Sequence, residues 1–329
     1  MNSEFAFALS NPGSEKALKL EAGMAVPAWR LSYQRRGFVT FKQEGGFSLD
    51  SLAVELACAR RLCLSLGKSA TREEAVARIV AQLGGAPVIH HARFHERAMQ
   101  GVVEAGTNAR VELGDVLGTV VELGEAEFWS GVHRHGKWLS TAPAGDAGVV
   151  MPAESPSRAW LKLEEALRFF DLKFSAADVV VELGCAPGGV VLALLDRGVS
   201  VIGVDPAKMA DRVMTAAIAE RAAAPAGEPW FYHCRKPAAL TSKRDLGAGV
   251  TWFMSDMNQS PDVVLKECAR FCKMAPTIRG VLITLKLTDL LQVSEKQKWR
   301  EALLAIGFKT VRLQQLSVHH KEFALLALR

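Results

Sequence analysis

The chain has 329 residues, of which 49% are hydrophobic and 23% charged, and this composition excludes a disordered chain, a collagen and a small disulfide scaffold. No stretch offers the ~18 uninterrupted apolar residues of a membrane helix. The first residues also lack the basic segment of a secretory signal. The six cysteines have no framework spacing, which favours reduced thiols and a cytoplasmic location. At ~150 residues per domain we expect two domains and no membrane partner, with the oligomeric state left open.

The net charge of +5 lies entirely in the second part of the chain. Residues 1–150 carry 16 basic and 16 acidic side chains, whereas residues 151–329 carry 24 basic and 19 acidic ones. This excess fits a polyanionic partner, and it equally fits an ordinary solvated surface.

Residues 1–140 mix helical and strand patterns, which predicts a small α+β domain. We expect strands at 4–9, 116–123 and 127–133, a hairpin of 28–32 and 37–42, and helices at 14–21, 51–62 and 71–83. Residues 141–156 are rich in proline and glycine and are typical of a linker.

From residue 157 onward, short apolar runs alternate with helical segments. We expect strands at 179–183, 199–204, 250–254, 281–285, 311–316 and 323–328, and helices at 190–197, 211–221, 261–274 and 295–306. This alternation predicts an α/β domain with a Rossmann-like, mostly parallel doubly wound sheet. Ligands of such sheets bind at the carboxyl ends of the strands.

A glycine-rich loop connects the first of these strands to its helix: Glu182-Leu183-Gly184-Cys185-Ala186-Pro187-Gly188-Gly189. Glycines let the backbone turn tightly and approach a ligand closely, although a plain strand–helix turn has the same composition. Asp205 ends the next strand, where a carboxylate can accept hydrogen bonds from a ribose or cap the following helix.

Four motifs together resemble the FtsJ-type ribose 2′-O-methyltransferases, which use S-adenosylmethionine. They are the glycine loop and the segments Pro156–Glu165 (PSRAWLKLEE), Ser255-Asp256-Met257, and Leu285-Lys286-Leu287 with Lys321-Glu322-Phe323. The long N-terminal part is similar to members that methylate a cytidine ribose in 23S ribosomal RNA and carry a THUMP-containing module. The resemblance implies a THUMP-like RNA-binding module at 1–140, a methyltransferase domain at 157–329, and an RNA partner, either 23S ribosomal RNA or the assembling large subunit.

The family implies a tetrad of catalytic residues, which here are Lys162, Asp256, Lys286 and Glu322. We expect Lys286 to be the base, with a pKa lowered by burial and the second ammonium and opposed by the carboxylates. Lys162 would tune it, Asp256 would orient it, and Glu322 would hold the pair. No metal is needed. The expected cofactor-binding residues are Gly184, Cys185, Ala186, Pro187, Gly188, Gly189, Asp205 and Asp256.

The chain departs from the family at three places, one of which is an N-terminal module shorter than the family's, so that a different RNA target stays open. Glu182 stands where an aspartate is usual, and residues 233–236 lack the acid expected to contact the adenine. Two alternatives therefore stay open: a methyltransferase acting on a transfer RNA, a small molecule or a protein, and a non-catalytic RNA-binding protein with a relic pocket.

Other groups give weaker signals. We expect surface or RNA-facing histidines, rather than a metal site, at His90, His91, His95, His133 and His135. Cys268 and Cys272 are predicted to be packed thiols. A basic, aromatic patch that could bind RNA, or a solvated hairpin, is predicted from Arg30, Arg35, Arg36 and Lys42 with Trp29, Tyr33 and Phe38.

Overall fold

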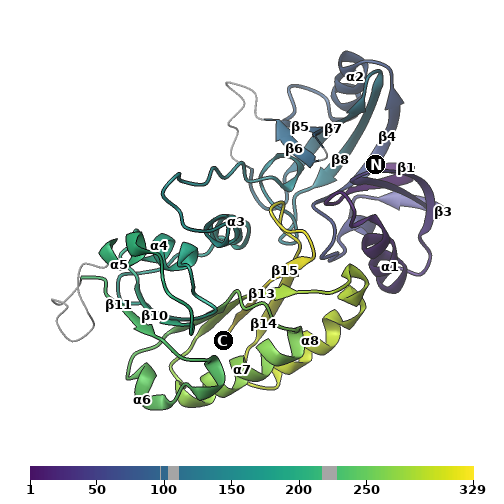
Figure 1. Cartoon of the computed structure of the whole chain (residues 1–329). Coiled ribbons are helices and arrows are strands. Elements are labelled where there is room, and N and C mark those ends of the chain that lie inside the picture. Colours follow the sequence, from purple (N-terminus) through teal and green to yellow (C-terminus); the bar gives the residue numbers. More distant parts are fainter. Residues whose placement is uncertain (97, 103–110, 217–227) are drawn as a thin grey trace. The chain divides into compact units, whose positions relative to one another are not determined.

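The computed structural model describes residues 1–96, 98–102, 111–216 and 228–329 (Figure 1). The chain forms two compact units, one of Met1–Gly148 with Gln314–His320 and one of Val149–Leu313 with Lys321–Arg329. A short segment near the C-terminus thus belongs to the first unit, whereas we had expected all of 157–329 to be one domain. None of the helices among these residues has the length and apolar character needed to cross a membrane.

The first unit contains an eight-stranded sheet in the order β2-β3-β1-β4-β8-β7-β5-β6. Its strands are β1 (Asn2–Leu9), β2 (Arg30–Arg35), β3 (Phe38–Ser48), β4 (Arg61–Ser69), β5 (Ile89–His95), β6 (Ala98–Val102), β7 (Val116–Gly124) and β8 (Glu127–Arg134). Its helices are α1 (Glu15–Ala25) and α2 (Arg72–Leu83), with short 3₁₀ turns at Asp50–Leu52 and Pro143–Gly145. The predicted hairpin, the helix at 71–83 and the late strand pair are confirmed.

The predicted helix at 51–62 is wrong. Residues 53–60 form a loop, and Arg61 starts β4, which pairs with β1 on one side and β8 on the other. Leu62, Cys63 and Leu64 are buried in this central strand. A short apolar run buried on both faces has no period of two, so its pattern does not separate strand from helix.

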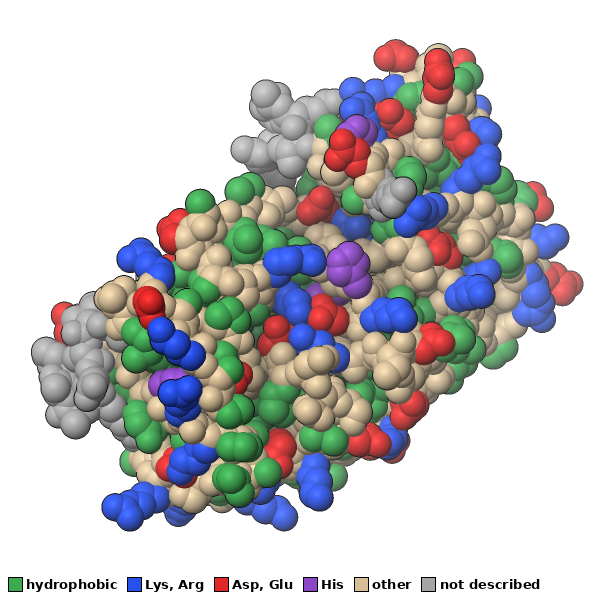
Figure 2. All heavy atoms as spheres, in the orientation of Figure 1, with side chains coloured by type: hydrophobic (Ala, Val, Ile, Leu, Met, Phe, Trp, Pro, Cys, Tyr) green, Lys and Arg blue, Asp and Glu red, His purple; other side chains and the backbone are tan. Residues whose placement is uncertain are grey.

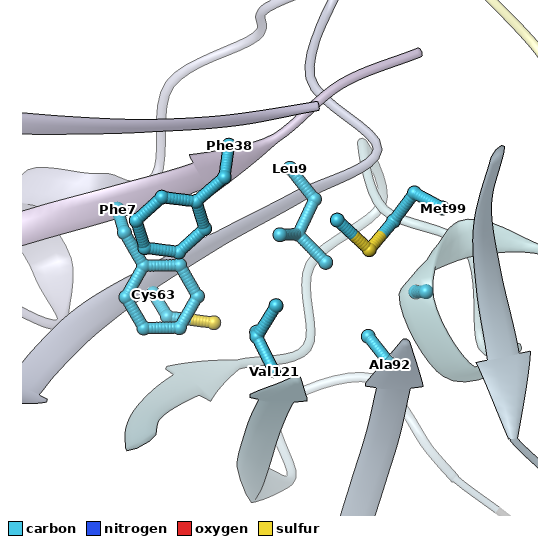
Figure 3. Packing of buried hydrophobic residues seen from close by; sticks show 8 residues of the cluster. Phe7, Leu9, Phe38, Cys63, Ala92, Met99 and Val121 are labelled. Atoms are coloured by element: carbon cyan, nitrogen blue, oxygen red, sulfur yellow. The ribbon is translucent and has the colours of Figure 1, made fainter. Parts of the chain in front are cut away.

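The two faces of this sheet are covered differently. α2 lies on the face that includes Gly118, because a Cβ on Gly118 would meet the side chain of Ile79. The opposite face carries a cluster of buried apolar side chains, including Phe7, Phe38 and Val121 (Figure 3). The short turn at Pro143–Gly145 covers part of this second face with Ala144.

Asn11 fastens the C-terminal segment into the first unit. Its buried side-chain amide donates hydrogen bonds to the carbonyl oxygens of Leu316 and His319, each at 2.8 Å. Gln314 and Gln315 add bonds to Ala59 and Ala57. The segment 314–320 runs directly into Lys321 and the strand that begins with Glu322.

We expect Asn11→Ala to lower the free energy of unfolding of the first unit by about 2–4 kcal/mol, because two buried carbonyl groups lose their donors. The exposed Asn2→Ala should change it by less than about 0.5 kcal/mol. Urea unfolding monitored by circular dichroism gives the midpoint of each variant for comparison. Equal midpoints for both would show that the amide does not hold the segment.

The second unit contains a seven-stranded sheet in the order β11-β10-β9-β12-β13-β15-β14. Its strands are β9 (Val179–Leu183), β10 (Ser200–Val204), β11 (Phe231–Cys234), β12 (Trp252–Ser255), β13 (Gly280–Lys286), β14 (Thr310–Gln314) and β15 (Glu322–Leu328). Its helices are α3 (Ala159–Phe170), α4 (Gly189–Leu195), α5 (Asp211–Ala216), α6 (Lys243–Leu246), α7 (Pro261–Met274) and α8 (Lys296–Leu304), with 3₁₀ turns at Ala238–Leu240 and Leu290–Glu295.

The strands from β11 to β13 are parallel, and β15 is antiparallel to β13. α3, α4 and α5 pack together on one side, and α7 and α8 pack together on the other (Figure 1). This confirms the predicted doubly wound sheet. The predicted helix at 211–221 is seen as far as Ala216, and its remaining residues lie outside the described ones.

The strand order reverses between β9 and β12. The chain passes from β9 through α4 to β10 on one side, whereas β12 lies on the other side of β9. The loops after β9 and β12 therefore diverge at the carboxyl edge of the sheet, which is where open α/β sheets bind ligands. On the molecular face shown in Figure 2, basic and acidic side chains are interspersed rather than gathered by sign.

Candidate active site

Four elements of the second unit bring the predicted tetrad together. Lys162 lies on α3, Asp256 follows β12, Lys286 ends β13, and Glu322 begins β15. Lys286 and Glu322 are opposite each other in the antiparallel pair of β13 and β15. The register of the sheet, rather than nearness in sequence, therefore brings these side chains together.

The four side chains form a ring in which positive and negative charges alternate. Lys162 Nζ lies 3.2 Å from Asp256 Oδ1 and 2.8 Å from Glu322 Oε1. Lys286 Nζ lies 3.0 Å from Asp256 Oδ1 and 3.5 Å from Glu322 Oε1. The side chains are between 14% and 22% exposed, so one side of the ring remains open to a reactant.

The expected lowering of the Lys286 pKa is wrong in this structure. Burial pushes the pKa of Lys286 down, but the charges and hydrogen bonds of Asp256, together with Glu322, push it up further, so the net direction is upward. Two carboxylates within 3.5 Å of Lys286 Nζ therefore outweigh the effect of burial. The ammonium of Lys286 is therefore the favoured state in the ring as it stands.

A small cavity of about 20 Å³ adjoins the ring, and its lining includes Lys162, Asp256 and Glu182. Glu182 is 1% exposed, and its Oε2 has no hydrogen-bond partner among the described residues. Burial, followed by the charges of Asp256 and Asp205, raises the pKa of Glu182 well above its ordinary value. A buried acceptor without a partner is expensive, and a cationic or N–H-bearing ligand group would satisfy it.

We expect Glu182→Gln to raise the free energy of unfolding at pH 8. Each kcal/mol of that increase should raise the thermal midpoint by about 2–4 °C. Because the folded-state pKa is raised, native stability declines as pH rises from the unfolded value, ~4.3, toward the folded one. The gain should therefore be smaller at pH 5. Thermal unfolding at both values, with calorimetry for S-adenosylmethionine, tests this. We also expect about tenfold weaker cofactor binding, and unchanged binding would remove Glu182 from the site.

The glycine loop makes close approaches that side chains would prevent. Gly184 has φ +75°, and a Cβ there would come within 2.9 Å of the Met257 backbone. A Cβ on Gly189 would lie 2.9 Å from the Ser157 carbonyl oxygen, where α3 begins. These contacts draw the loop after β12 and the start of α3 toward the loop after β9, which assembles the elements carrying Asp256 and Lys162.

Asp205 is tied into the loop. Its carboxylate accepts hydrogen bonds from the Ala186 N–H at 3.1 Å and the Ala207 N–H at 2.8 Å. A carboxylate has about four acceptor positions, so two hydroxyl groups of a ribose could still bind. Cys185 points the other way, since its buried thiol contacts Met209 at 3.7 Å. Only the backbone of Cys185 could meet a ligand here.

Several weaker expectations are wrong. His90, His133 and His135 are buried in the first unit rather than surface-facing. Burial, with the charge of Arg61, lowers the pKa of His90 to about 3, and Arg61 donates to His133 Nε2 at 2.9 Å. Of the predicted basic, aromatic patch, Trp29 and Phe38 are buried in the core.

Cys268 and Cys272 are buried on α7, as expected.

Sequence reasoning did not assign Glu182 to the site, although it noted its identity. The available signal was a carboxylate near the end of an otherwise apolar buried strand, where a charged side chain needs a partner. For the adenine side, β11 supplies His233, whose Nε2 lies 3.0 Å from the Asp205 carbonyl oxygen. Near this strand, Asp245 on α6 pairs with Lys236 at 2.6 Å and also accepts the Ser242 backbone N–H at 2.8 Å, so its carboxylate is engaged within the protein.

Comparison with known proteins finds a family model that matches part of the second unit. Residues 156–284 match the FtsJ-like methyltransferase family model. The chain is 27% identical to the ribosomal RNA large subunit methyltransferase M of Thauera aminoaromatica over 240 residues, 70% of this chain and 61% of that protein. It is 29% identical to that of Teredinibacter turnerae over 220 residues, 63% of this chain and 57% of that protein. The chain thus spans about three fifths of the length of these relatives.

Among solved structures, TrmN from Thermus thermophilus is 16% identical over 99% of both chains, with a TM-score of 0.35. The sequence matches confirm the predicted resemblance to the FtsJ-type methyltransferases and, within them, to RlmM, the large subunit methyltransferase M. S-adenosylmethionine is the cofactor of the matched family, and the unpartnered Glu182 oxygen and the Asp205 carboxylate fit its ammonium and ribose groups.

Proposed function

We propose that this chain transfers a methyl group from S-adenosylmethionine to a ribose 2′-hydroxyl of RNA, with 23S ribosomal RNA as the substrate. The observation that carries the proposal is the ring of two lysines and two carboxylates, built from Lys162, Asp256, Lys286 and Glu322. It supports an acceptor hydroxyl that must lose a proton, and the FtsJ-like match of residues 156–284 supports the donor.

When bound, S-adenosylmethionine supplies an electrophilic methyl group and a neutral leaving group. The acceptor oxygen forms the new bond to the methyl carbon, the carbon–sulfur bond breaks, and the hydroxyl proton passes to Lys286 Nζ. Lys286 can accept it only in the uncharged form, so Asp256 and Glu322 must hold an amine whose pKa they also raise. Much of the rate enhancement then comes from alignment of the acceptor hydroxyl by the four side chains of the ring.

Lys162 is proposed to position the acceptor and to share the two carboxylates with Lys286. It lies within 3.2 Å of both Asp256 and Glu322, so its ammonium offsets their charge. The residues proposed to hold the cofactor are Glu182, Asp205, Asp256 and the backbone of the loop from Gly184 to Gly189. The first unit is proposed to be the RNA-binding, THUMP-like module, acting in the cytoplasm.

The test uses large-subunit RNA from cells that lack this protein, the purified chain and S-adenosylmethionine labelled in the methyl group. We expect label in RNA, located by mass mapping to the ribose of one nucleotide, and no label with Lys286→Ala. Label that survives nuclease treatment as protein or solute would overturn the RNA assignment. A label on a base would overturn the ribose assignment, and an absence of cofactor binding would favour a relic pocket.

A further inference from the structure

We propose that the first unit carries a binding groove for single-stranded RNA at one edge of the sheet face that α2 does not cover. The groove would stack bases on Tyr33 and Trp129 and hold phosphates with cations on the same face. This inference rests on RNA being the substrate, but it concerns a surface of the first unit and is tested by binding rather than by methyl transfer.

The groove is a hollow of about 420 Å³ that opens to solvent and is lined by residues of β1, β2, β3, β4 and β8. Its floor consists of small or hydroxyl-bearing residues, among them Thr40, Ser65 and Gly67, and its walls include Phe5, Tyr33 and Trp129. It adjoins the apolar cluster of Figure 3, against which Tyr33 and Trp129 pack without being fully buried. The hollow therefore lies at the edge of a buried apolar cluster, where Tyr33 and Trp129 are only partly covered.

The two aromatic rings are held in place. Tyr33 and Trp129 stack with their centroids 5.5 Å apart and planes 28° apart, and Trp129 also packs on Phe38 at 5.0 Å. Glu127 Oε1 accepts the Tyr33 hydroxyl at 2.7 Å and the Trp129 indole N–H at 3.4 Å. The parts of these fixed rings that line the hollow are available to stack a base, and they lose little freedom on binding.

The strand register places cations on the face of these rings. Phe5 is opposite Lys42, and Lys42 is opposite Arg30, so all three side chains share a face. Lys68 is opposite Trp129, and Arg35 lies over the Tyr33 ring at 5.5 Å. Glu127 offsets part of this charge, since it lies 3.5 Å from both Arg35 and Lys68. Arg30 and Lys42 are exposed, and residues 28–43 contain four basic and no acidic side chains.

This combination favours a single strand over a duplex. In a duplex the bases are stacked on each other and their flat faces are covered, so rings in a hollow gain nothing from them. A single strand offers both free base faces and a phosphate backbone. The aromatic residues of the groove differ from those of the patch expected from sequence. Trp29 and Phe38 are core residues, whereas the groove is lined by Trp129 and Phe5, which lie far apart in the chain.

The test measures fluorescence anisotropy of a labelled twelve-nucleotide single-stranded RNA of mixed, unpaired sequence, titrated with the full chain. We expect Trp129→Leu to weaken binding roughly 5- to 100-fold, since one base loses its platform. Trp138→Leu is the matched control, because Trp138 is a half-buried indole of the same unit outside the groove, and its affinity should change by less than about twofold.

A second variant keeps the proposal testable if Trp129→Leu unfolds the sheet. Arg30→Ala with Lys42→Ala changes two exposed side chains and should reduce the slope of log affinity against log salt by about 1.4, at ~0.7 for each phosphate. Unchanged affinity and slope in these variants, equal preference for a duplex of the same sequence, or no binding by the unaltered chain would each overturn the groove. Loss of methyl transfer with RNA binding retained would instead count against the proposed function.

Discussion

Lys286→Ala is expected to slow methyl transfer to RNA by about 10³-fold, within the range that a positioned base contributes. The variant removes the only proposed proton acceptor and leaves Lys162 alone between Asp256 and Glu322. The measurement is a single-turnover rate with labelled S-adenosylmethionine, so that product release does not limit it. Binding of the cofactor, measured by calorimetry, should change much less than the rate.

Lys298→Ala is the matched control for this experiment. Lys298 is an exposed lysine of α8 paired with Asp262 and lies outside the tetrad. Its single-turnover rate should stay within about twofold of the unaltered chain, as for other surface substitutions. A Lys286→Ala rate equally close to the unaltered one would show that another group takes the proton.

The second half of the chain was predicted well because its elements are locally encoded. β9 at Val179–Leu183 and α7 at Pro261–Met274 have the expected bounds, since an apolar β-branched run and a proline at the start of a helix are strong local signals. The tetrad could be found because each member sits in its own short motif. The resemblance supplied their number and identity, and the sheet register accounts for their proximity.

What could not be predicted depends on contacts between distant segments. Whether Lys286 has a raised or lowered pKa depends on whether the two carboxylates outweigh burial, and only the positions of these groups in the fold decide that. Trp29 and Phe38 lie near several arginines in the sequence, which suggests a surface patch. In the structure both side chains are buried, and Tyr33 lies at the edge of the buried cluster. The capture of 314–320 by Asn11 joins residues some three hundred positions apart.

Asp256→Asn is the second change with a large expected effect. Asp256 contacts both lysines, at 3.2 Å and 3.0 Å, and it is the foremost group that raises the pKa of Lys286. Asparagine has the same shape but no charge, so neither ammonium is held as firmly. We expect the maximal single-turnover rate to fall by about 10²-fold, since alignment of the acceptor is lost.

The pH dependence separates this loss of charge from simple damage to the fold. Lys286 reacts as the free amine, and its pKa is raised above the ordinary value, so the rate of the unaltered chain should climb with pH and still be climbing at about pH 10. In Asp256→Asn the pKa of Lys286 falls, because a neighbouring negative charge is gone, and the climb should level off at a lower pH. Single-turnover rates from pH 6 to 10, with short reaction times to spare the RNA, show whether each curve is still climbing at pH 10 or has levelled off. If the Asp256→Asn curve has the shape of the unaltered one and is merely lower at every pH, Asp256 does not set the protonation of the base and acts only in the fold or in binding.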